Sequence, residues 1–186
     1  MPDANDTDAV ETVAPAPSAK LIRGNVQVAD DWVLSRDEQT LPEARPAIVP
    51  FTLWQESLAD SSVDQERLAP WLASDCETTA ELAETLSAAP LVAIDFPSFT
   101  DGRGYTVARL LRERFGYAGE LRAIGDVLID QLYYLRRCGF DTLALRDDQD
   151  LDAAFRALSS FSVRYQPAID LDEPLFAQRR RERAGA

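Results

Sequence analysis

A glycine-bracketed arginine lies in the segment TDGRGY, residues 100–105, shortly after an apolar run that ends at Asp95. The guanidinium of Arg103 is a planar donor that suits phosphate, sulfate or carboxylate, and Gly102 and Gly104 permit positive φ and close backbone approach. A helix that begins here adds its unpaired N–H groups and the positive end of its dipole. The pattern predicts an oxyanion-binding loop at a strand-to-helix junction.

The same loop has a purely structural interpretation. In it, Thr100 or Asp101 caps the helix and Arg103 pairs with a neighbouring acid. The loop fits neither of two established nucleotide-binding motifs, because it has no lysine after the second glycine and no GxGxxG spacing. The sequence therefore leaves two interpretations, an oxyanion or partner contact and a capped turn.

Other polar side chains lie at or near expected strand ends. Asp126 follows the segment ELRAIG, where it is a favoured helix N-cap or, with Asp95 and Asp130, part of a carboxylate cluster for Mg²⁺ or acid-base chemistry. Arg122 alternates with apolar neighbours, so it must face solvent or meet a buried partner. No catalytic residue and no metal ligand is assigned. The candidate anion- or partner-binding residues are Asp95, Ser98, Thr100, Asp101, Gly102, Arg103, Gly104, Arg122 and Asp126.

The composition excludes several reaction classes. The 186 residues include no histidine, which removes Ser-His-Asp triads, Cys-His dyads and the usual catalytic zinc sites. Lys20 is the one lysine, which argues against Schiff-base chemistry. Cys76 and Cys138 form no CxxC motif, and we expect small buried thiols, with a structural disulfide or a reactive Cys138 as the alternatives. No flavin, nicotinamide or metal signature is visible, so the cofactor is unknown and the question of catalysis stays open.

The charge is strongly acidic and unevenly distributed. A net charge of -13 argues against a nucleic-acid partner, which requires basic patches. Residues 1–90 carry 17 acidic and 5 basic side chains, whereas residues 91–186 carry 15 and 14. The sequence has no signal-peptide pattern and no apolar run of about 18 residues. We therefore expect a cytoplasmic protein with no membrane segment. We expect a disordered acidic tail at residues 1–20, one domain at 21–170 and a polar, basic tail at 171–186.

The hydrophobic pattern predicts an α/β domain. A short hairpin is expected at residues 25–34, and strands at residues 48–54, 91–95, 120–124 and 142–146. Helices are expected at residues 78–88, 105–115, 127–138 and 151–161, with Thr78 or Thr79, Gly116 and Gly139 as caps. Short connections between alternating strands and helices favour a mostly parallel sheet of about five strands, either open or like half a barrel, preceded by the N-terminal β-hairpin.

Residues 96–141 closely resemble the bacterial family known as domain of unknown function 934. The shared pattern is a Phe-Pro pair, the TDGRGY loop, an arginine-rich helix, GELRA, GD and RRCGF. The resemblance is looser over residues 21–160. Members are often encoded beside sulfite reductase and phosphoadenylyl-sulfate reductase, and some carry an oxidoreductase label without an established reaction.

The resemblance implies a role in sulfate assimilation and cysteine biosynthesis. We therefore expect an accessory protein of assimilatory sulfate or sulfite reduction that binds an anionic metabolite or a reductase partner through residues 95–105. Sulfite reductase and phosphoadenylyl-sulfate reductase are the implied partners, and a small oxyanion is the implied ligand. The alternatives are an oxidoreductase of the same pathway with an unidentified cofactor and a scaffold with no small ligand. The family transfers no catalytic residue.

Overall fold

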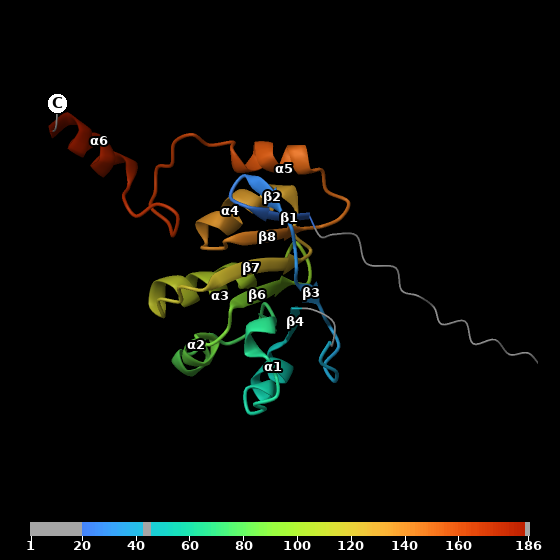
Figure 1. Ribbon diagram of the computed structural model, residues 1–186. Coiled ribbons are helices and arrows are strands. Elements are labelled where there is room, and N and C mark those ends of the chain that lie inside the picture. Colours follow the sequence, from blue (N-terminus) through green and yellow to red (C-terminus); the bar gives the residue numbers. More distant parts are fainter. Residues whose placement is uncertain (1–19, 43–45, 185–186) are drawn as a thin grey trace, which may run out of the picture.

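The computed structural model describes residues 20–42 and 46–184. The acidic tail predicted at residues 1–20 therefore lies outside the described residues, except for Lys20. Eight strands form one curled, open sheet that resembles half a barrel (Figure 1). The strands are β1 (Lys20–Arg23), β2 (Val26–Val28), β3 (Val33–Leu34), β4 (Ala47–Pro50), β5 (Leu68–Leu72), β6 (Leu91–Phe96), β7 (Glu120–Gly125) and β8 (Thr142–Leu145). The α-helices described are α1 (Phe51–Ser57), α2 (Ala80–Leu86), α3 (Arg103–Arg109), α4 (Leu132–Arg137), α5 (Leu151–Leu158) and α6 (Leu175–Ala184).

The strand order is β2-β1-β8-β7-β6-β5-β4-β3. Strands β3 to β8 are parallel and follow one another in chain order, whereas β1 pairs antiparallel with both β2 and β8. Right-handed crossovers that always step in the same direction place their helices on the same face of the sheet. The α/β class is thus confirmed, but the prediction of about five mostly parallel strands is wrong, because the sheet is mixed and has eight.

Helices α1 to α5 pack on one face of the sheet and form the main core. Alternate side chains of β6, Val92 and Ile94, contribute to this core together with Trp54 of α1, Val107 of α3 and Leu135 of α4. All six residues of β6 are buried, as expected for a parallel strand that is covered on both sides. This strand therefore holds the loop that follows it on a rigid base.

The other face is covered by residues 29–36, which we call the strap and which include β3. The strap runs from β2 at one edge of the sheet to the opposite edge (Figure 1). Trp32 of the strap packs on a small apolar cluster. Two ion pairs hold the strap on the sheet: its Asp30 lies 2.8 Å from Arg122, and its Arg36 lies 2.7 Å from Asp95. The strap thus seals the face that the helices leave open.

Two local predictions at the N-terminal side are wrong. The hairpin is β1–β2, which turns at Gly24 with φ of 61°, and not residues 25–34, whose last two residues form β3 at the other edge of the sheet. The predicted strand 48–54 ends at Pro50, and α1 begins at Phe51. The helical turn buries Trp54 completely in the core, and this burial outweighs the β-propensity of the segment.

The later elements agree closely with the sequence pattern. Thr79 caps α2 by accepting the Leu82 N–H at 3.1 Å, and Gly116 and Gly139 have φ of 65° and 99°. The predicted helix 105–115 is α3 followed by a π-helical turn, η2 (Leu110–Arg114), while α4 is preceded by a 3₁₀ turn, η3 (Ile129–Gln131). Within residues 20–42 and 46–184, no helix has the length and apolar character needed to cross a bilayer.

Candidate functional site

The predicted loop lies at the carboxyl edge, which we define as the edge of the sheet where β5, β6, β7 and β8 end. Ser74 follows β5, residues 97–102 follow β6, Asp126 follows β7 and Arg146 follows β8. Ligand and partner sites of parallel α/β proteins form at this edge because loops and helix N-termini converge there. The expected strand-to-helix junction is therefore present, with α3 beginning at Arg103.

Arg103 is already paired within the loop. Its Nε donates to Asp101 Oδ1 at 3.0 Å and its Nη2 to Asp101 Oδ2 at 2.7 Å, while Asp75 lies 3.6 Å from Nη1. The Ser74 hydroxyl donates to the same Asp101 carboxylate at 2.6 Å. The hydrogen bonds from Arg103, followed by the one from Ser74, hold the pKa of Asp101 well below its ordinary value. An incoming oxyanion must compete with this ionised carboxylate for the guanidinium.

Neither bracketing glycine has a positive φ, and close packing requires glycine at Gly104 but not at Gly102. Gly102 has φ of -87° and Gly104 is helical. A Cβ at Gly104 would lie 2.8 Å from Cζ of Phe96, so glycine here lets the first turn of α3 rest on that ring. Positive φ occurs instead at Gly125, at 92°, where β7 ends beside the same loop.

Asp126 fixes the loop and does not cap a helix. Its Oδ2 accepts the backbone N–H of Phe99 at 2.8 Å, and its Oδ1 pairs with Arg146. The Phe99 hydrogen bond and then the Arg146 contact lower the pKa of Asp126. The buried Gln131 donates to the Phe99 carbonyl at 3.0 Å, so Phe99 is held on both sides of its backbone. Phe99 itself is 51% exposed.

Asp95 and Arg122 lie on the strap side of the sheet, apart from Arg103. Asp95 accepts two hydrogen bonds from Arg36, at 2.7 and 3.2 Å, and Arg36 also stacks over Trp71 at 5.6 Å. Arg122 is 4% exposed and pairs with Asp30, so of its two predicted alternatives the structure shows the buried partner and not the solvent-facing side chain. These two residues hold the strap and do not share a pocket with Arg103.

The remaining candidates are distributed along the loop. The hydroxyls of Ser98 and Thr100 are 3.0 Å apart, and Asp101 N–H donates to the Ser98 carbonyl at 2.9 Å. In the described part of the chain, no three or more Cys, Asp or Glu side chains are grouped so as to hold a metal ion, so the carboxylate cluster considered for Asp95, Asp126 and Asp130 is not formed. The nine candidates therefore divide into a loop group and a strap group.

A model of the family described as "Bacterial protein of unknown function (DUF934)" matches residues 70–176. The match includes the whole TDGRGY loop and the elements from β6 to β8 that position it. This chain belongs to the DUF934 family. The match begins inside β5, so the strap and its Arg36 lie outside the matched segment. The comparison with curated proteins finds no match.

Both cysteines of this DUF934 protein are free thiols. Burial raises the pKa of Cys138, which is 1% exposed, and burial together with Asp75 and Glu77 raises that of Cys76. The expectation of buried thiols is confirmed for Cys138, whereas Cys76 is only half-buried. Neither environment favours the thiolate that a nucleophilic or redox cysteine needs.

The candidate residues do not include three partners of the loop, Ser74, Asp75 and Arg146, although the sequence already placed Arg146 at the end of the predicted strand 142–146. A signal for the other two exists, since Ser74 and Asp75 directly follow an apolar run. Polar residues just after parallel strands converge at one edge of the sheet. Applied to all four strands, this rule predicts the carboxyl-edge group.

Proposed function

We propose that this DUF934 protein is an accessory protein of assimilatory sulfate or sulfite reduction that docks on a reductase through residues 95–105. Phe99 is the observation that carries the docking role. Two side chains, from Asp126 and Gln131, fix its backbone, while the residue stays half exposed at the carboxyl edge. A preorganised exposed aromatic is the kind of anchor that dominates protein interfaces. The pathway rests on the family resemblance of the TDGRGY and RRCGF motifs.

The charges around Phe99 favour a protein partner over a free oxyanion. Arg103 is neutralised by Asp101, and Arg146 by Asp126 and Asp148, so neither guanidinium is vacant. The two arginines are solvent-accessible and lie at the same carboxyl edge as Phe99. A central aromatic with a polar rim is the usual anatomy of a transient interface. A partner that covers the edge can use these pairs without breaking them.

We expect the full chain to bind purified sulfite reductase or phosphoadenylyl-sulfate reductase, and Phe99→Ala to weaken that complex about tenfold or more. Biolayer interferometry with the immobilised DUF934 protein measures both affinities. Phe176→Ala is the matched control, because Phe176 is 63% exposed but lies on α6, outside the loop. The expected result is an unchanged affinity for this control.

Three outcomes contradict the proposal, and a fourth favours its alternative. If the protein binds neither reductase, the proposed partner is wrong. If Phe99→Ala binds a reductase as tightly as the wild type does, the loop is not the docking site. Calorimetry with sulfite and sulfate tests the alternative that the loop binds an anionic metabolite. Tight binding of either anion by the wild type, together with loss of that binding in Arg103→Gln, favours this alternative. Growth of a deletion strain on sulfate as sole sulfur source counts against the pathway.

A further inference from the structure

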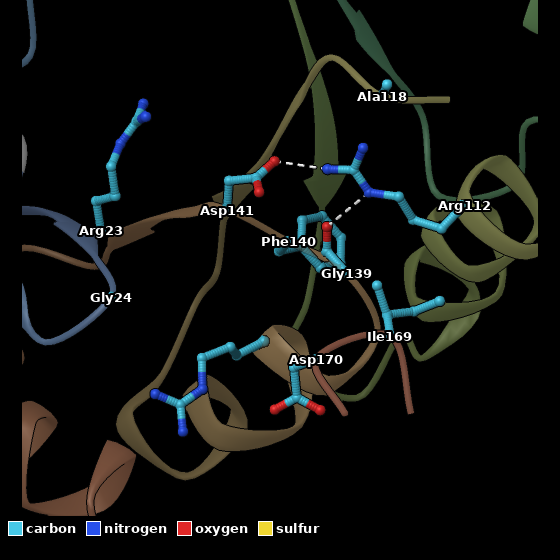
Figure 2. A pocket seen from close by; sticks show the side chains of 10 residues that line it. Arg23, Gly24, Arg112, Ala118, Gly139, Phe140, Asp141, Ile169 and Asp170 are labelled. Carbon is cyan, nitrogen blue, oxygen red and sulfur yellow. Dashed lines mark hydrogen bonds and ion pairs between the residues drawn. The ribbon is translucent and has the colours of Figure 1, made fainter. Parts of the chain in front are cut away.

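A cavity of about 470 Å³ opens at the amino edge of the sheet, where β7 and β8 begin and β1 ends (Figure 2). Its walls come from segments that are far apart in the sequence: Arg23 and Gly24 of the β1–β2 turn, Gly139 to Asp141 before β8, and Ile169 and Asp170 from the chain after α5. Small-molecule sites have volumes of this order. It lies at the edge opposite to the docking loop, so it is a separate feature.

The two carboxylates in this cavity are compensated by arginines. Asp141 accepts from Arg112 at 2.6 Å, a contact that Figure 2 shows, and from the Leu121 N–H at 2.8 Å. Asp170 lies 2.8 Å from Arg164 and 3.7 Å from Arg137, within ion-pair distance although neither alignment makes a hydrogen bond. Neither carboxylate therefore presents an unbalanced negative charge to the cavity.

Among the residues that the structure describes, Arg136 is the one lining arginine without a counter-charge. Within the same residues, its guanidinium donates only to neutral oxygens, Asn25 Oδ1 at 3.4 Å and the Leu158 carbonyl at 3.2 Å. Its Nε is buried and has no hydrogen-bond partner among the residues described, and none of their carboxylates forms an ion pair with it. A partly buried cation without an anion is costly, so this arginine indicates a missing negative group.

Arg23 adds a second positive group to the cavity. It is 55% exposed, and its partner Glu120 also pairs with Arg122 at 3.2 Å. Among the described residues that line the cavity, arginines outnumber carboxylates: Arg23, Arg112 and Arg136 stand against Asp141 and Asp170. The excess is notable in a chain whose net charge is -13, since such a local positive field attracts anions.

We propose that this cavity binds a small organic oxyanion, a carboxylate or phosphate ester, with Arg136 and Arg23 as its charge partners. The apolar side chains of Phe140 and Ile169 supply a wall for the carbon part of such a ligand. Gly24 and Gly139 leave backbone without a side chain at the rim. An inorganic ion uses the arginines alone, whereas an organic anion also uses the apolar wall.

The test is isothermal titration calorimetry of the full chain with phenyl phosphate, benzoate and inorganic phosphate. We expect phenyl phosphate to bind more tightly than inorganic phosphate and its affinity to fall with rising salt concentration. Arg136→Gln, which keeps hydrogen-bonding groups but removes the charge, should weaken binding about tenfold or more. Arg23→Gln, at a more exposed position, should weaken it in the same direction.

Arg156→Gln is the control, because Arg156 is an exposed arginine on α5 that does not line the cavity. We expect it to leave the affinity unchanged. The proposal is overturned if none of the three probes binds at about 10 mM, or if Arg136→Gln binds as the wild type does. An equal loss of affinity in Arg136→Gln, Arg23→Gln and Arg156→Gln also overturns the proposal, because that result indicates non-specific attraction to positive charge.

Discussion

We expect Gly125→Ala to lower the free energy of unfolding by about 3 kcal/mol or more. Two physical costs combine at this residue. Its φ of 92° is unfavourable for any residue with a Cβ, and a Cβ here would contact the Phe96 carbonyl oxygen and lie 2.6 Å from Asp95 Oδ1. Because these atoms belong to the buried end of β6, they cannot move away without disturbing the sheet.

Gly116→Ala separates the two costs. Gly116 has a similar positive φ, 65°, but a Cβ there would have nothing within 4 Å, so we expect a loss of only about 1–2 kcal/mol. Urea denaturation followed by tryptophan fluorescence measures both variants. Equal losses for the two variants contradict the prediction, because they show that the contact with β6 adds nothing. Gly125→Ala should also weaken partner binding, since Asp126 next to it holds Phe99.

The strand-to-helix junction at TDGRGY could be predicted because its signals are local. The apolar run of β6 is buried at every residue, and capping glycines with positive φ mark the helix ends. The pairing of Arg103 with Asp101 is the contact with a neighbouring acid that the structural interpretation expected, but its two other partners could not be predicted. Ser74 and Asp75 lie almost 30 residues before Arg103, and their contact depends on β5 and β6 being neighbours in the sheet. Periodicity predicts a strand but not its neighbour.

The sheet was underestimated because its outer strands are very short. Strand β2 has three residues and β3 has two, too few for an alternating pattern to be distinguished from a loop. The prediction of one strand at residues 48–54 is wrong for a related reason. This segment contains a buried strand and a helix that buries Trp54, and the two share one apolar run. Only tertiary packing shows where the chain changes direction at Pro50.

The sequence around Arg136 explains why a basic residue occurs there, but it does not predict that this residue lacks a counter-charge in the described part of the chain. Near the C-terminus of α4, a basic residue complements the helix dipole, and the sequence calls for no ligand. The structure adds that its neighbours, Asn25 and the Leu158 carbonyl, come from distant segments and bring no negative charge. The missing counter-charge is a property of the assembled edge, so no pattern around residue 136 predicts it.

The strap should depend on Arg122, and we expect Arg122→Gln to lower the free energy of unfolding by about 3 kcal/mol or more. The substitution leaves Asp30 and Glu120 without the cation that lies 2.8 and 3.2 Å from them. Because Asp30 is in the strap, its release should also expose Trp32 and shift tryptophan fluorescence to the red before global unfolding. Arg109→Gln is the control, since its pair with Glu113 is exposed and contributes at most about 0.5 kcal/mol.

The effect of Arg122→Gln should also depend on pH, through Glu120. Burial opposes ionisation of this carboxyl, but hydrogen bonds from Thr142 and Arg122 outweigh burial and hold its pKa below the ordinary 4.5. A lowered pKa stabilises the folded state fully above the ordinary value, and this contribution is lost as pH falls through the folded-state pKa. The stability difference between wild type and Arg122→Gln, from urea titrations, should therefore be largest near neutral pH and shrink below pH 4.5. A difference that stays constant on acidification shows that Arg122 stabilises the strap by packing and not by charge.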